Sequence, residues 1–283
     1  MTSKADFHTH STASDGRLTP TELVRLAVSR GLSILGVTDH DSTEGIPEAL
    51  AAASQYPGFT LVPGVEMSTD IPGDEVHVLG FFIDPEDATF QKELGDLRMA
   101  RRDRGRMMVE KLHGLGIDIP WERVEAAAGD GAVGRPHVAQ VLQEMGYVSS
   151  FQEAFDRYIG RNGPAYAERV KLTPAEAIAM LAKAGTLPVL AHPASLSNLD
   201  GVLEELKAAG MVGMEVYYQD YDHNTLTRLA AAAERHGLLK LGGSDFHGIG
   251  GPRERLPGDI PLPDEAIDTF MSAAQQLIGA RKH

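Results

Sequence analysis

Nine side chains of the types that bind metal ions lie at or beside short segments that resemble β-strands. They are six histidines and three carboxylates, namely His8, His10, Asp15, His40, Glu66, His77, His192, Asp245 and His247. The chain has no cysteine, so it offers no thiolate ligand, no disulfide and no cysteine nucleophile. Nitrogen and oxygen ligands of this kind suit manganese, iron or zinc.

The spacing of these residues supports a shared site. His8 and His10 are two positions apart in a predicted strand, so both side chains point to the same side. Asp245 and His247 repeat this spacing in the last predicted strand, which would neighbour the first if the sheet closed. Asp39 and His40 point to opposite sides, so we expect His40 to be the ligand and Asp39 to play a supporting or structural part.

A single histidine at the end of a strand is more often a surface or hydrogen-bonded residue than a ligand. Here the coincidence recurs at six of the seven predicted strands. Burying so many ionisable groups together without a cation would be costly, so metal binding is the economical explanation.

Strands and helices alternate over most of the chain. The predicted strands are 5–10, 33–40, 59–68, 75–83, 187–193, 213–218 and 238–247, and the helices between them are 19–31, 46–56, 175–185, 199–210 and 226–237. Alternation of this kind favours a parallel sheet, and seven such strands suggest an α/β barrel. In a parallel barrel the carboxyl ends of the strands share one face, where active sites lie.

The alternation stops between residues 90 and 167, where only helices are predicted. We therefore expect a barrel made of residues 1–89 and 168–283 and an inserted helical cap domain made of residues 90–167. No apolar run is long enough to span a membrane, and the first residues do not resemble a signal peptide. The expected location is the cytoplasm, without a membrane partner.

The charge balance limits the partners. Lys and Arg total 26 against 40 Asp and Glu, which gives a formal net charge of -14. An acidic surface repels the phosphate backbone, so tight binding of long nucleic acid is not expected. A small phosphorylated substrate can still bind where metal ions reverse the local field.

Six segments taken in order resemble the motifs of the polymerase and histidinol phosphatase (PHP) superfamily. They are FHTHSTASDG, VTDHDS, PGVEMS, VHVLGF, LAHP and GSDFH. The resemblance is greatest to the stand-alone members that act as nucleoside 3′,5′-bisphosphate phosphatases or as 5′-exonucleases on short RNA. It implies a distorted seven-stranded (β/α)7 barrel with a helical domain inserted between the strands that carry His77 and His192.

The resemblance also implies two or three divalent metal ions. The first would bind His8, His10, Glu66 and Asp245; the second would share Glu66 and add His77 and His192; the third would bind Asp15, His40 and His247. Glu66, His192 and Asp245 are the expected catalytic residues. Many relatives have a histidine in place of Asp15, which leaves the occupancy of the third site open.

Four residues are expected to bind substrate by the same resemblance: Arg135 and His137 in GRPHVA, and Arg161 and Tyr166 in IGRNGPAY. A solvated Arg135 and a simply packed Tyr166 are the alternatives. The arginines at 101, 102, 104 and 106 are more typical of a solvated helix face, with contact of one or two of them with an anionic ligand as the alternative. Glu215 is expected to support a ligand or form a salt bridge, and the histidines at 113, 223, 236 and 283 are expected at the surface.

The predicted reaction is removal of the 3′-phosphate of a nucleoside 3′,5′-bisphosphate. Two bridged ions lower the pKa of a shared water enough to supply hydroxide near neutral pH, and a third offsets charge on the phosphate. The alternatives are a 5′-to-3′ exoribonuclease on short RNA, an amidohydrolase-type C–N hydrolase, a histidinol-phosphate-type phosphatase and a non-catalytic metal-binding module.

Overall fold

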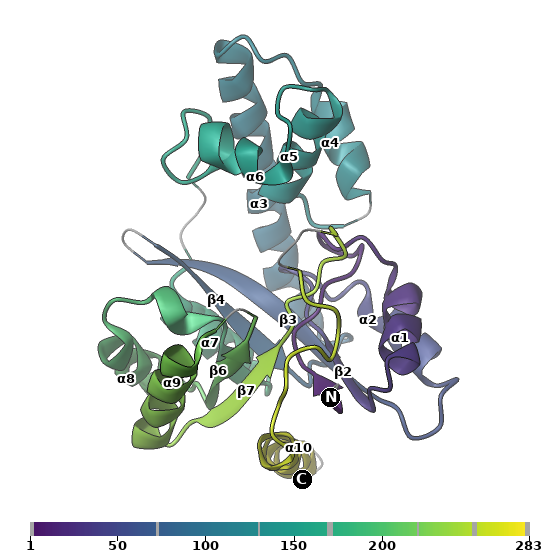
Figure 1. Cartoon of the computed structure of the whole chain (residues 1–283), viewed down its shortest axis with the longest axis vertical. Coiled ribbons are helices and arrows are strands. Elements are labelled where there is room, and N and C mark those ends of the chain that lie inside the picture. The colour runs from purple at the N-terminus through teal and green to yellow at the C-terminus, as the bar shows by residue number, and fades with distance from the viewer. Residues whose placement is uncertain are drawn as a thin grey trace.

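A seven-stranded sheet forms the body of the protein (Figure 1). The structure, a computed structural model, describes residues 3–71, 74–129, 131–168, 172–219, 221–250 and 254–280. The strands follow one another in space in chain order: β1 (Ala5–Asp6), β2 (Ile34–Val37), β3 (Thr60–Ile71), β4 (Asp74–Phe81), β5 (Leu187–Leu190), β6 (Gly213–Tyr218) and β7 (Leu239–Gly243). The prediction of a seven-stranded α/β barrel is therefore confirmed.

The two ends of the sheet meet just beyond β1 and β7. Thr9 and Phe246 form a parallel bridge, and the amide of Asp245 donates to the carbonyl of His8 at 2.9 Å. The close approach requires a glycine at position 243, where a Cβ atom would lie 2.5 Å from the nitrogen of His8. This seam brings the two pairs of predicted ligands from opposite ends of the chain side by side.

The expectation of a fully parallel sheet is wrong for β4. This strand pairs antiparallel with both β3 and β5, whereas the other pairs are parallel. The connection from β3 to β4 is too short for a parallel arrangement. A parallel neighbour needs a crossover of a dozen or more residues. The reversal places His77, opposite Ser68 in the β3–β4 pairing, at the same end of the barrel as the carboxyl ends of the parallel strands.

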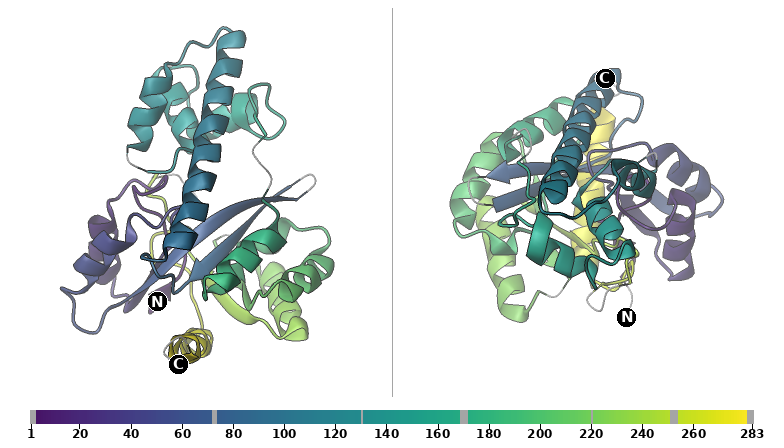
Figure 2. Two further views of the ribbon diagram at one scale, coloured as in Figure 1. Left: turned by 180° about the vertical axis from the view of Figure 1, so that it is seen from behind. Right: turned by 90° about the horizontal axis from the view of Figure 1, so that it is seen from above.

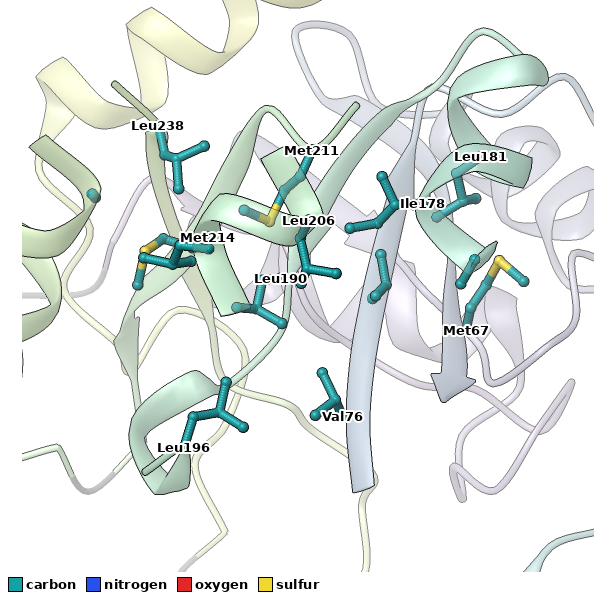
Figure 3. Packing of buried hydrophobic residues seen from close by; sticks show 14 of the residues in the cluster. Met67, Val76, Ile178, Leu181, Leu190, Leu196, Leu206, Met211, Met214 and Leu238 are labelled. Carbon is teal, nitrogen blue, oxygen red and sulfur yellow. The ribbon is translucent and has the colours of Figure 1, made fainter. Parts of the chain in front are cut away.

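Helices cover the sheet on two sides. Helices α1 (Pro20–Ser29) and α2 (Ile46–Ala53) pack over one part, and α7 (Pro174–Lys183), α8 (Leu199–Ala208) and α9 (His223–His236) over another (Figure 2). A short 3-10 helix, η2 (Pro193–Ser195), follows β5. Thr19 caps α1, with Pro20 at its first position. Figure 3 shows Leu190 and Met214 of the strands packed with Leu206 in the core beneath α7, α8 and α9.

The end of the barrel opposite the predicted ligands is closed by α10 (Asp264–Ala280), a helix that was not expected (Figure 1). Phe270 is fully buried there, with its ring centroid 4.9 Å from that of Phe7 and 5.2 Å from that of Phe81. Both contacts are edge-on, an arrangement that aromatic rings favour.

The segment between β4 and α7 is helical. It contains α3 (Ala88–Gly114), α4 (Trp121–Ala128), α5 (Arg135–Glu144), α6 (Phe151–Ala154) and the π-helix η1 (Phe155–Ile159), which share a hydrophobic core (Figures 1 and 2). Helix α3 belongs to two cores, because Phe90 and Leu94 pack with the barrel while Met108 and Leu112 pack with the other helices. The expected boundary at residue 90 therefore falls inside a continuous helix. We refer to the segment from α3 to residue 167 as the cap.

None of the helices in the described residues is long and apolar enough to cross a membrane.

Candidate active site

All nine predicted metal ligands meet at the end of the barrel that faces the cap. Three groups of donor atoms are compact enough to hold an ion, with the atoms of each group within 4.8 Å of one another. The groups are His8, His10, Glu66 and Asp245; His40, Glu66 and His77; and His10, Asp15, His40 and His247. The first group has the composition that the resemblance implied. The second has His40 where the resemblance implied His192, and the third adds His10 to the expected Asp15, His40 and His247.

The first group is the most compact. Glu66 Oε2 lies 3.2 Å from Nε2 of both His8 and His10. Asp245 Oδ1 lies 3.2 Å and 3.0 Å from the same two nitrogens. Ligands about 2.0–2.1 Å from a tetrahedral ion are roughly 3.3 Å apart, so these separations fit one small divalent ion.

Buried atoms without hydrogen-bond partners support this fit. Among the described residues, His8 Nε2, His10 Nδ1, His40 Nδ1 and Glu66 Oε2 are buried and accept or donate no hydrogen bond. Orphaned polar atoms are costly in a protein interior, and a bound cation would satisfy them. On the far side of the His8 ring, Nδ1 lies 3.0 Å from Glu215 Oε1, which turns Nε2 toward the ion position. The expected supporting part of Glu215 is confirmed by this contact.

Glu66 has its two oxygens directed at different histidines. Oε1 lies 2.8 Å from His77 Nδ1 and 3.2 Å from His192 Nε2, while Oε2 faces the first group. His40 Nδ1 is also 3.2 Å from Oε2. A carboxylate with this geometry is able to bridge two ions.

The third group is wider. Asp15 lies 3.4 Å from His247 Nε2 and 3.9 Å from His40 Nε2, measured between the nearest ionisable atoms. The loop that carries Asp15 is held by the buried carboxylate of Asp39, which accepts from Ser11 N at 2.8 Å and from Ser14 Oγ at 2.6 Å. The interpretation of Asp39 as a supporting group is confirmed.

The electrostatics of the site favour bound cations. Burial alone would raise the pKa of the Glu66 carboxyl, but His40, His8 and His77 hold this pKa well below its usual range. Burial opposes ionisation of Asp15 and Asp245 too, and neighbouring histidines again keep the pKa of each carboxyl well below normal. The pKa values of the buried Asp15 and Glu66 and of the partly buried Asp245 are thus low because histidines surround them, and divalent ions would supply positive charge there in place of imidazole protons.

Two of the candidate ligands have an unusual backbone conformation. His192 has φ 29° and Asp245 has φ 52°, both in the left-handed region that residues with a Cβ rarely adopt. The amide of His192 donates to Glu215 Oε2 at 2.7 Å, which helps to hold it there. Strained backbone of this kind is typical of functional sites.

A pocket lies between the candidate ligands and the cap. Its barrel side includes Asp15, His40, Ser68 and His77, and its cap side includes Arg101, Arg104, Met108, Arg135 and Phe155. Arg101 pairs with Asp41 and with the hydroxyl of Ser68, and Arg104 donates to the carbonyl of Ala167 at 2.8 Å. Arg101 and Arg104 therefore do not lie on the solvated face that the sequence suggested, whereas Arg106 is exposed. The i, i+3 spacing of 101 and 104 was the available signal.

The four predicted substrate-binding residues occupy different environments. Arg135 lines the pocket, with its guanidinium carbon 5.6 Å from the centroid of Phe155. In the described part of the chain, His137, Arg161 and Tyr166 are not among the residues that line it. His137 is buried and its Nδ1 accepts from Gly134 N at 3.0 Å, while the Tyr166 ring stacks 5.1 Å from the Arg104 guanidinium carbon.

Comparisons with known proteins agree with this site. The PHP domain family model matches residues 6–128. A 3′,5′-nucleoside bisphosphate phosphatase from Chromobacterium violaceum is 34% identical over 271 residues, which cover 90% of this chain and 92% of the relative. A 5′-3′ exoribonuclease from Haemophilus influenzae is 36% identical over 252 residues, or 87% of this chain and 91% of the relative.

A solved structure is similar along nearly the whole chain. It is that of a protein from Bifidobacterium adolescentis assigned as a metal-dependent phosphoesterase, with a TM-score of 0.86, 31% identity, and coverage of 95% of this chain and 96% of the other. The chain belongs to the PHP family. It is a metal-dependent phosphoesterase, as the sequence predicted.

Proposed function

We propose that this protein removes the 3′-phosphate from nucleoside 3′,5′-bisphosphates. The observation that carries the proposal is the two-sided pocket, which has candidate metal ligands on the barrel side and Arg101, Arg104 and Arg135 on the cap side. A substrate with two phosphates suits this arrangement, because one phosphate can lie at the metal side while guanidinium groups bind the other. The activity named for the Chromobacterium violaceum relative supports the same substrate class.

In this proposal the barrel and the cap have different roles. The barrel, residues 1–89 and 168–283, holds the ions, and the cap, residues 90–167, binds the phosphate that is not cleaved. We assign the ligands as the three sets that the resemblance implied, with Glu66 as the bridge and manganese, iron or zinc as the metal. Ions bound there would make a water more acidic and offset charge on the phosphate.

Three residues of the chain act closest to the reacting phosphate in this proposal. Glu66 would hold the ions through its two oxygens, and Asp245 and His192, which lie close to ligand nitrogens and to Glu66, would complete the ligand sets on either side of it. Arg135, Arg161 and Tyr166 would orient the substrate from the cap, and the buried His137 would act by holding the start of α5, where Arg135 lies.

A second candidate, stepwise 5′-to-3′ hydrolysis of short RNA, is favoured by the likeness to the Haemophilus influenzae exoribonuclease. The test incubates the manganese-loaded protein with adenosine 3′,5′-bisphosphate and, separately, with a 5′-phosphorylated trinucleotide. Release of inorganic phosphate from the bisphosphate, with the trinucleotide left intact, is the expected result. Release of mononucleotides from the trinucleotide at a higher kcat/KM would replace the proposal by the second candidate.

A further inference from the structure

A β-bulge in β6 turns two polar side chains toward the candidate metal ligands. Glu215 pairs with Leu241 and Tyr217 pairs with Gly242, so Val216 is an extra residue in this strand. In a regular strand, residues 215 and 218 would point to opposite faces. The extra residue resets the alternation, which is how bulges commonly redirect side chains beside active sites.

Both redirected side chains contact residues of the first ligand group. Glu215 reaches His8, as described above, and the hydroxyl of Tyr218 donates to Asp245 Oδ2 at 2.6 Å. The neighbouring Tyr217 packs instead with the hydrophobic clusters around the barrel. Opposite the bulge, a Cβ atom at Gly242 would lie 1.8 Å from the carbonyl oxygen of Tyr217, so the pairing requires glycine there.

The contact from Tyr218 separates the roles of the two oxygens of Asp245. Oδ2 accepts the hydroxyl hydrogen, while Oδ1 lies 3.2 Å from His8 Nε2 and 3.0 Å from His10 Nε2, on the ion side. The hydrogen bond from Tyr218 therefore restricts rotation of this carboxylate about its last bond, together with the contact between Oδ1 and His10. The backbone of Asp245 is also in the left-handed region, so its side chain depends on such contacts for its orientation.

We propose that Tyr218 is a positioning residue that presents a single oxygen of Asp245 to the ion bound by His8, His10 and Glu66, and thereby sets the affinity for this ion. The inference rests on the ligand set proposed above. Tyr218 is not expected to touch the substrate, because it acts through Asp245.

The test compares Tyr218→Phe with Tyr217→Phe, which removes a hydroxyl from the same bulge on the side away from the ligands. Metal-free protein is titrated with Mn²⁺ by calorimetry, and its Tm is measured with and without Mn²⁺. Loss of a partner that orients a ligand commonly weakens metal binding about 10–100-fold. Tyr218→Phe should show this loss for one ion and a smaller Mn²⁺-induced rise in Tm, while Tyr217→Phe should match the wild type.

Asp245→Asn separates the inference from the ligand assignment. If Asp245→Asn binds every ion with wild-type affinity, the proposed ligand set is wrong. If Asp245→Asn loses an ion but Tyr218→Phe binds Mn²⁺ as the wild type does, only the inference about Tyr218 is wrong. A Tyr218→Phe protein whose Tm falls equally with and without Mn²⁺ would also overturn it, because that pattern marks a purely structural hydrogen bond.

Discussion

The guanidinium of Arg101, on the cap helix α3, is paired with the carboxylate of Asp41, which directly follows His40 in the barrel. The same guanidinium donates to the hydroxyl of Ser68, two residues after Glu66. One side chain of the cap is thus linked to two chain segments that carry candidate metal ligands, and the pairing fixes the cap over the barrel opening.

Replacing Arg101 by Ala should therefore destabilise the protein. The Asp41 carboxylate is 2% exposed and would lose its partner, and breaking a buried ion pair from one side costs about 3–5 kcal/mol. Urea unfolding measures the change. The double variant Arg101→Ala/Asp41→Asn removes the unpaired charge as well and should be less destabilised than the sum of the single variants. Additive losses would show that the two side chains are not coupled.

Phe270→Ala should lower the free energy of unfolding by about 3–5 kcal/mol, because it removes a fully buried ring and leaves a cavity beside Phe7 and Phe81. Ile278→Ala, in the same helix but 38% exposed, is the matched control and should change stability far less. Similar losses of unfolding free energy in the two variants would mean that α10 stabilises the protein as a whole helix rather than through the packing of the Phe270 ring.

Removing the metal should abolish phosphoester hydrolysis, and manganese should restore it. The candidate ligands include the buried carboxylates of Asp15 and Glu66 and the partly buried carboxylate of Asp245, whose charges need compensation. Activity is measured after chelation and dialysis, with the metal content determined by elemental analysis. Full turnover in protein verified as metal-free would refute a metal-dependent mechanism.

Glu66→Gln should lose most of its turnover and one of its bound ions while staying folded. The amide cannot supply two anionic oxygens to the two histidine sets that now face Oε1 and Oε2. Metal content, circular dichroism and kcat are compared with those of the wild type. Wild-type metal content and turnover in the variant would show that Glu66 is not a bridge.

Arg135→Ala should raise KM for a nucleoside 3′,5′-bisphosphate with the metal content unchanged. Loss of one charged hydrogen-bonding partner costs about 1.5–3 kcal/mol, which corresponds to roughly a ten- to hundredfold weaker interaction. With p-nitrophenyl phosphate, which has no second phosphate, the loss should be smaller. An equal loss on both substrates would place Arg135 at the phosphate that is cleaved.

The metal centre was predictable because its residues follow from local rules. Pairs such as His8 and His10 lie on one side of an extended segment whatever the rest of the fold does, and strand ends converge in any α/β barrel. The number of strands and the helical insertion also follow from periodicity. The structure brings all nine candidate ligands together at one end of the barrel, although their division among individual ions remains a prediction.

Other features depend on contacts between distant segments. The direction of β4 is an exception, because the missing helix between the two predicted strands already indicated a connection too short for a parallel crossover. The role of α10 depends on Phe270 meeting Phe7 across the barrel, and the pairing of Arg101 depends on where α3 crosses the opening.

The seam between β1 and β7 also has a consequence for how the protein is made. His8 and His10 leave the ribosome early, but their partner Asp245 lies more than 200 residues later, and the two segments pair only when the barrel closes. Contacts so distant in sequence slow folding, because closing a long loop lowers the conformational entropy of the chain before the contact can form. A nascent chain that ends before β7 therefore lacks Asp245, one of the two carboxylates that face its first histidines, and the complete first ligand group forms only late in synthesis.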